Sequence, residues 1–326
     1  MRLKIVILLT FFFRAVTFGQ QLPIYSQYLY NKILINPSIA GSDGYTRFGI
    51  TAREQWVGYD GTPRTFTAAW QTRILKQRLF IKQKNNNRQI LKPSSDGNVG
   101  LGGYIFSDRN GLINRNGVQF SYAHHTWLKE NTQLSFGLAA NLYHYRIDAN
   151  KINFENPDDP ILNSSLRRGL FVPDATFGIS ILNPKFSLGV SADQLFQASG
   201  KIGGSGSYKD FNIKRQYSIF GSYDIEQGYY NIIQPSFIFM TSGQMLPQAD
   251  IGVTYIFHDN FLTGLAYRTS KALIATVGIN HNNLFIGYAF DFTMQEIQRV
   301  TYGTHEVSFA MKFGDSSRKY RWLDRY

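Results

Sequence analysis

The chain has 326 residues, a formal net charge of +12 and no cysteine. The lack of cysteine excludes disulfides, thiolate metal sites and lipid attachment to an N-terminal cysteine. The mean hydropathy is negative, although aromatic residues make up 15% of the chain. Strands that are apolar on one face only, with aromatic residues at the membrane edges, give this combination.

The first 19 residues have the features of a secretory signal peptide. Arg2 and Lys4 precede an apolar stretch at 5–13, which is too short for a helix that spans a membrane. Arg14 interrupts the apolar region, and small residues before Gln20 predict cleavage after Gly19. The sequence therefore predicts export of the mature chain from residue 20 onward.

Residues 45–313 repeat one pattern, a run of alternating apolar and polar or small residues followed by a turn. In the last run Val307, Phe309 and Phe313 share one face, while Glu306 and Lys312 share the other. A side-chain period of two is typical of strands with one apolar face. Only a closed barrel satisfies the backbone polar groups of such strands in lipid. We predict an all-β fold, a transmembrane antiparallel β-barrel of about 14 strands, because the following runs alternate: 45–52, 63–72, 98–107, 116–127, 132–145, 173–182, 185–193, 214–224, 229–240, 247–257, 260–269, 271–280, 283–291 and 303–313.

The connection lengths predict an orientation for the barrel. Five of the six even-to-odd connections are short turns, whereas long polar loops follow the fifth, seventh and thirteenth runs. Bacterial barrels have short periplasmic turns and longer outer loops. We therefore expect an integral outer-membrane protein with both termini in the periplasm and with outer-membrane lipid around its wall. A soluble sandwich has no reason to follow this parity.

Three segments lie outside the alternation, and parity places all three at the periplasmic seam. Residues 20–44 are rich in aromatic residues, residues 73–97 form the one long even-to-odd connection, and residues 314–326 form a basic tail. Basic patches steer acidic partners toward a surface, although a solvated loop is the simpler explanation of a charge run. The candidate partner-binding residues are Arg73, Lys76, Arg78, Lys82, Lys84, Arg88, Lys92, Arg318, Lys319 and Arg321. Nucleic acid is not predicted as a partner, because no aromatic stacking platform accompanies these residues.

We predict that residues 20–44 fold as a plug in the periplasmic mouth of the barrel. Aromatic side chains at this density are costly to leave in water, and Pro37 disfavours helix at Asn36. The plug candidates are Tyr25, Tyr28, Asn36 and Pro37. The alternative is a flexible leader before the first strand.

Several motifs resemble the PorP/SprF family of type IX secretion system outer-membrane proteins of Bacteroidota. The start at 21–41 contains Gln-Tyr and then Asn-Pro-Ser-Ile-Ala-Gly, with Ser38 where the family usually has alanine. Further along the chain are Arg-Glu-Gln-Trp at 53–56, Gly-Thr-Pro-Arg-Thr at 61–65, Gly-Leu-Ala-Tyr-Arg at 264–268 and Gly-Thr-His-Glu at 303–306. Together these motifs cover essentially the whole mature chain. The basic segment at 73–97 is longer than is usual in the family.

The resemblance implies a barrel that takes part in exporting or anchoring cell-surface proteins. In that system the partners are cargo proteins or their C-terminal domains, together with periplasmic ring and motor proteins. The SprF-like branch is tied to the secretion of gliding adhesins. The alternative function is a transport channel, either a porin or a FadL-like route for small or hydrophobic solutes.

The remaining polar motifs favour structural roles over chemistry. We expect the residues at the seam and in the lumen to pin loops through ion pairs: Arg53, Glu54, Trp56, Arg268, His305 and Glu306. His305 next to Glu306 could act as a general base, but the spacing of the serines identifies no nucleophile for it. Asp158 and Asp159 lack the alternating ligands of a calcium loop. We therefore predict no catalytic residue, no metal and no cofactor.

Overall fold

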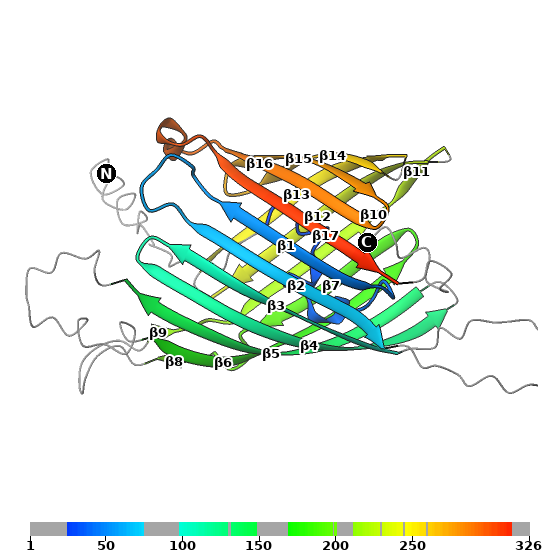
Figure 1. Cartoon of the computed structure of the whole chain (residues 1–326), viewed down its shortest axis with the longest axis horizontal. Helices are drawn as coiled ribbons and strands as arrows, with labels where there is room; N and C mark the ends of the chain where they lie inside the picture. The colour runs from blue at the N-terminus through cyan, green and yellow to red at the C-terminus, as the bar shows by residue number, and fades with distance from the viewer. Residues whose placement is uncertain are drawn as a thin grey trace, which may run out of the picture.

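The computed structural model describes residues 25–74, 98–129, 132–148, 169–197, 199–200, 211–228, 230–243, 245–258 and 260–314. Its main feature is a wall of long tilted strands (Figure 1). The strands of the first half are β1 (Thr46–Glu54), β2 (Arg64–Ile74), β3 (Val99–Asn110), β4 (Ile113–Lys129), β5 (Thr132–Ile147), β6 (Leu170–Asn183) and β7 (Phe186–Asp193). Those of the second half are β10 (Gln216–Tyr223), β11 (Ile225–Gln227), β12 (Asn231–Ser242), β13 (Met245–Phe257), β14 (Phe261–Arg268), β15 (Ala272–His281), β16 (Leu284–Thr293) and β17 (Thr304–Phe313).

Every wall strand pairs antiparallel with its sequence neighbours, and the first pairs with the last. Thr46 of β1 lies opposite Phe313 of β17, so the sheet closes on itself. β10 and β11 pair with the same strand, β12, on either side of Asp224, and count as one wall strand. The predicted barrel of 14 antiparallel strands is confirmed. Two very short strands, β8 (Ser199–Gly200) and β9 (Phe211–Asn212), form a separate pair.

The alternation of side chains sorts the wall into an apolar outer face and a polar inner face. Ile251 and Leu265 are 63% and 72% exposed on the outside, whereas Glu306 is fully buried on the inside. This is the opposite of a soluble protein, and lipid covers the outer face of such a barrel. Among the described residues, no helix is both long and apolar enough to cross a membrane.

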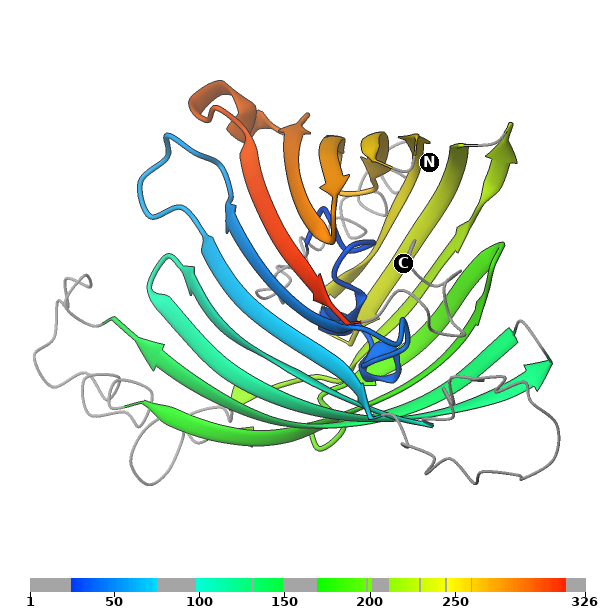
Figure 2. The same cartoon turned by 45° about the vertical axis from the view of Figure 1, so that its right-hand side comes forward.

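Residues 25–45 lie inside the barrel, and we call them the lumenal segment (Figure 2). They contain two 3₁₀ helices, η1 (Lys32–Leu34) and η2 (Pro37–Ile39). The first contacts β2 and β3, and the second contacts β4, β5 and β6. A third, η5 (Glu296–Val300), lies in the connection before β17. The segment was expected in one mouth of the barrel only, but it reaches further. It extends from wall residues near the start of β17 to the beginning of β1 at the other mouth.

The two mouths differ less in their connections than the sequence analysis supposed. The mouth where β1 begins carries short turns such as the one between β6 and β7, together with the long connection between β2 and β3. The opposite mouth carries the long connections after β5 and β7, but also short ones after β3, β12 and β14. Which mouth faces the periplasm therefore stays a prediction. The predicted signal peptide at 1–19 and nearly all of the tail lie outside the described residues.

Candidate functional site

Five charged side chains gather in the lumen, and we call them the lumenal ion cluster: Arg53, Asp250, Arg268, Asp291 and Glu306. Antiparallel register creates two of the contacts, because Arg53 lies opposite Glu306 and Asp250 lies opposite Arg268. The Arg53 guanidinium donates to Asp291 at 2.7 Å and to Glu306 at 2.9 Å. Buried charges are stable only when they are paired and hydrogen-bonded in this way.

The start of the lumenal segment completes this cluster. The backbone amides of Ser26 and Gln27 donate to the two oxygens of Glu306, each at 2.8 Å. The Ser26 hydroxyl donates to Asp291 and accepts from Arg53 at 2.6 Å. The cluster holds three carboxylates and two guanidinium groups, so the donors of the segment offset an excess of negative charge. The segment is therefore bound to the wall through charge-assisted hydrogen bonds.

Lys32 anchors the middle of the segment. Its ammonium donates to the Ser187 hydroxyl at 3.0 Å and lies 5.8 Å from the centre of the Phe220 ring. Burial lowers the pKa of Lys32 to about 7, and the nearby Asp224 carboxylate opposes this shift. Tyr30 stacks on Phe285 with the ring centres 4.7 Å apart. Polar and aromatic contacts thus alternate along the segment.

Asn36 fixes the second 3₁₀ helix against the wall. Its side-chain oxygen accepts from the Ser38 amide at 2.9 Å and so caps the helix. Its side-chain nitrogen donates to the backbone oxygens of Ile179 and Val190, at 3.1 and 2.9 Å. A β-carbon at Gly178 would collide with Asn36. The wall is therefore shaped for this turn.

His125 and Arg73 hold the end of the segment. Nε2 of His125 lies 2.9 Å from the Ala40 carbonyl oxygen, and its Nδ1 lies 2.7 Å from the Ser135 hydroxyl. The Arg73 guanidinium donates to the Gln133 side chain at 2.8 Å. It also donates to the Ser42 carbonyl oxygen at 3.4 Å. These contacts lie close to the point where the chain enters β1.

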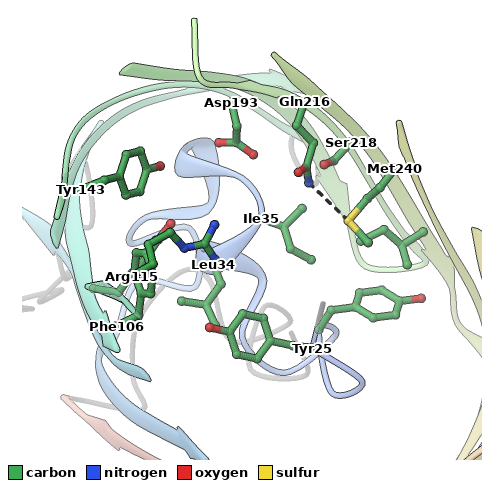
Figure 3. A pocket seen from close by; sticks show the side chains of 13 residues that line it. Tyr25, Leu34, Ile35, Phe106, Arg115, Tyr143, Asp193, Gln216, Ser218 and Met240 are labelled. Atoms are coloured by element: carbon green, nitrogen blue, oxygen red, sulfur yellow. Dashed lines mark hydrogen bonds between the residues drawn. The ribbon is translucent and has the colours of Figure 1, made fainter. Parts of the chain in front are cut away.

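A cavity between the segment and the wall, which we call the vestibule, is shown in Figure 3. It encloses about 650 Å³ of space not occupied by atoms, part of which is open to solvent. Its wall residues lie on β3, β4, β5, β7, β10 and β12, in the part of the barrel where the long connections after β5 and β7 begin. Tyr143, Arg115 and Phe106 face Asp193 and Gln216 across it. One side of the vestibule thus carries two aromatic rings and a guanidinium group, and the other carries a carboxylate and an amide.

The structure separates the predicted seam residues into two groups. Arg53, Arg268 and Glu306 face the lumen and belong to one cluster. Glu54 does not: it pairs with Arg64 on the exposed rim, because neighbouring residues of a strand face opposite ways. For the same reason His305 points away from Glu306 and lies 2.7 Å from the Tyr288 hydroxyl. The amide of Trp56 donates to Thr304, which ties the β1–β2 connection to β17.

The predicted basic docking surface does not include Arg73. This residue is 4% exposed and faces the lumen, where it is bonded to Gln133 and Ser42, so it is unavailable to a periplasmic partner. Its position in the inward register of β2 explains this. The other nine candidates lie outside the described residues: Lys76, Lys82, Lys84, Lys92, Lys319, Arg78, Arg88, Arg318 and Arg321. Of the plug candidates, Tyr28, Asn36 and Pro37 are buried in the lumen, and Tyr25 bonds to Thr67.

Several residues that join the segment to the wall were not predicted from the sequence: Ser26, Gln27, Lys32, His125, Gln133 and Asp250. A signal was available for Asp250, because Gln248 and Asp250 alternate with apolar residues in their run. Ser26 and Gln27 carry no such signal. In the part of the chain that the structure describes, no group of three or more His, Cys, Asp or Glu side chains is arranged to hold a metal. The geometry supports binding of a segment of the same chain.

Residues 17–311 match the model of a protein family described as type IX secretion system membrane protein PorP/SprF. A search of curated protein sequences gives no match. Three solved structures illustrate the similarity of fold. The Acinetobacter baumannii outer membrane protein Omp33 is 8% identical, with a TM-score of 0.44 over 83% of this chain and 100% of its own. The P. putida toluene transporter TodX is 8% identical, with a TM-score of 0.43 over 86% of this chain and 93% of its own. BamA from Haemophilus ducreyi lacking POTRA domains 1–3 is 9% identical, with a TM-score of 0.41 over 82% of this chain and 70% of its own.

Proposed function

Because the chain belongs to the PorP/SprF family of type IX secretion system membrane proteins, we propose that it scaffolds the export or surface anchoring of cargo proteins. In this proposal the wall fixes the protein in the outer membrane, and the outer loops meet cargo or its C-terminal domain. The basic segment at 75–97 and the tail at 315–326 meet periplasmic ring and motor proteins. The barrel acts by binding and positioning, and we propose no enzymatic step.

The lumenal segment is the observation that favours scaffolding over a transport channel. It is bonded to the lumenal ion cluster through Glu306 and to β4 through His125, with β5 and β6 in contact between these points. Asn36 and Ser38 within it are fully buried. A diffusion channel requires an open, water-filled path with charged rings. We therefore propose that residues 20–44 act as a plug and that the isolated barrel does not conduct.

Planar-bilayer conductance of the purified protein tests the plug. We expect the full-length mature chain to give no large, stable open-channel current. Deletion of residues 20–44 should raise the conductance, because residues 25–44 lie in the lumen. Both proteins must be folded barrels, which is checked by the difference in their electrophoretic mobility before and after heating. Large stable currents from the intact chain would support the porin or FadL-like alternative instead.

Removal of positive charge from the basic segment tests whether it binds the proposed periplasmic partners. Lys or Arg to Gln substitutions in one variant cover Lys76, Arg78, Lys82, Lys84, Arg88 and Lys92. A control variant carries the same exchange at Lys151, Arg167 and Arg168, in the connection after β5. Basic patches steer acidic partners in a salt-dependent way, so the first variant should recover less ring and motor protein from native membranes. Equal recovery with both variants would refute docking through this segment, while leaving the plug intact.

A further inference from the structure

Four oxygen-bearing side chains lie on three adjacent wall strands, and we call them the oxygen cluster: Asn141, Asp174, Thr176 and Asp193. Of these, Asp193 lines the vestibule. Asn141 of β5 lies directly opposite Asp174 of β6 in the strand register. Thr176 lies two residues further along the same face of β6. The pairing of β6 with β7 begins at Phe177 and Ala192, and Asp193, the next residue of β7, is hydrogen-bonded to the Thr176 side chain. The Asp193 carboxylate points into the vestibule (Figure 3).

Two acceptor oxygens of the oxygen cluster have no hydrogen-bond partner. Oδ1 of Asp174 accepts from the amides of Ala175 and Phe196, at 2.7 and 3.1 Å, but its Oδ2 is buried and unpaired among the described residues. The Asn141 amide nitrogen donates to Thr176 at 2.7 Å, while Oδ1 of the same planar group is buried and unpaired. Asp174 and Asn141 are 3% and 5% exposed. An unpaired buried acceptor is costly unless something binds it.

The oxygen cluster also carries two carboxylates without a paired cation in the described part of the chain. Asp250 and Asp291, in the lumenal ion cluster, are each paired with arginine. Two arginines, Arg115 and Arg215, use terminal guanidinium nitrogens in other contacts, although the Nε of each has no hydrogen-bond partner among the described residues. Arg115 pairs with Asp108 at 3.3 Å and lies 5.2 Å from the centre of the Phe106 ring. Arg215 donates to the Leu195 carbonyl oxygen at 2.6 Å. A bound cation would supply the ionic partner that neither carboxylate has among the described residues.

We propose that the oxygen cluster binds a divalent metal ion, of which Ca²⁺ is the best fit. Hard divalent cations prefer carboxylate, amide and hydroxyl oxygens, and Ca²⁺ accepts six to eight of them. Asp174, Asp193 and Asn141 offer such oxygens from three adjacent strands, and the vestibule admits water for the remaining positions. A compact ion reaches the buried oxygens more readily than an alkylammonium group, which carries its chain with it. The site joins β5, β6 and β7, so metal binding stabilises this part of the wall.

Thermal unfolding of the full mature chain in detergent tests the site. After treatment with EDTA, addition of CaCl₂ should raise the Tm, because a ligand that binds only the folded state stabilises it. Tb³⁺ should give luminescence sensitised by nearby tyrosines, and Ca²⁺ should displace it. Asp193→Asn and Asp174→Asn should remove both responses. Asp60→Asn, in the exposed β1–β2 connection, should keep both.

Asn141→Asp serves as a second variant, because it adds a carboxylate and should tighten the binding of Ca²⁺ at least several-fold. This gain keeps the test decisive if Asp174→Asn fails to fold. A Ca²⁺ response that is absent from the wild type, or unchanged in Asp193→Asn, would overturn the proposal. A response to methylammonium but not to Ca²⁺ would do the same and assign an organic cation.

Discussion

The Arg53 guanidinium is almost completely removed from water, and its two carboxylate partners decide whether it can remain there. Glu306 is fully buried and accepts hydrogen bonds from Arg53 and from two backbone amides of the lumenal segment. Both terminal nitrogens of Arg53 are hydrogen-bonded to carboxylates, and only its Nε has no partner among the described residues. Pairing of this kind is the condition for a stable buried ion pair. The outer rim offers a contrast, because the Arg64–Glu54 pair lies largely in solvent.

Replacement of Arg53 by Gln should destabilise the barrel by about 3–5 kcal/mol, since it leaves Glu306 buried without a cation. The same replacement at Arg64 should cost about 0–1 kcal/mol, because solvent screens an exposed pair. Urea-induced unfolding in detergent, followed by the loss of folded electrophoretic mobility, measures both. Equal stability of the two variants would contradict a structural role for the lumenal ion cluster.

At the scale of elements, the lumenal segment and the wall fit because the wall has glycine where the segment approaches most closely. A β-carbon at Gly137 would collide with the backbone of Ser38, and one at Gly178 would collide with Asn36. Gly49 also faces the lumen, but a β-carbon there would lie 3.6 Å from its nearest neighbour, an ordinary contact. The glycines of β5 and β6 therefore define the seat of the second 3₁₀ helix.

Gly137→Ala should displace the segment or cost about 1–3 kcal/mol, as overpacking of a tight site does. Gly49→Ala should leave the segment in place. Limited proteolysis of the folded protein tests this, because a displaced segment becomes accessible in the first variant only. Resistance of both variants to proteolysis, at unchanged stability, would show that the segment does not need this seat.

At the scale of the whole molecule, the barrel has two mouths that the lumenal segment connects. The segment begins among the charges near the start of β17 and ends where β1 begins. Short and long connections occur at both mouths, so their lengths alone do not orient the barrel. The predicted periplasmic location of both termini depends on that orientation.

Single cysteines can settle the orientation, because the chain has none of its own. Asp60 and Asn260 are exposed at opposite mouths, in the β1–β2 and β13–β14 connections. A membrane-impermeant maleimide on intact cells should label Asp60→Cys. Asn260→Cys should react only after the outer membrane is opened. The reverse labelling pattern would place the mouth where β1 begins and β17 ends on the outside of the cell.

Much of the wall and part of the site were predictable from particular residues. The alternation at Val307, Phe309 and Phe313 gave the last strand and its lipid-facing side, and similar runs gave the others. Inward charges such as Arg268 and Glu306 were also predictable, because parity assigns them to the lumen. Arg73 was predicted to bind a partner because it lies beside a long basic connection. Its place in the alternation of β2 puts it in the lumen instead.

The sequence by itself determined the strands, their faces and the membrane that such a barrel requires, because a period of two is a local property of the chain. Only the tertiary structure decided that Arg53 binds Asp291 rather than its neighbour Glu54, and that Ser26 and Gln27 complete the charges. It also decided that Asn141 lies opposite Asp174 and that Asp193 lines the vestibule. These contacts depend on barrel closure and on which residues register brings together across the lumen. A strand's own sequence does not specify its partners there.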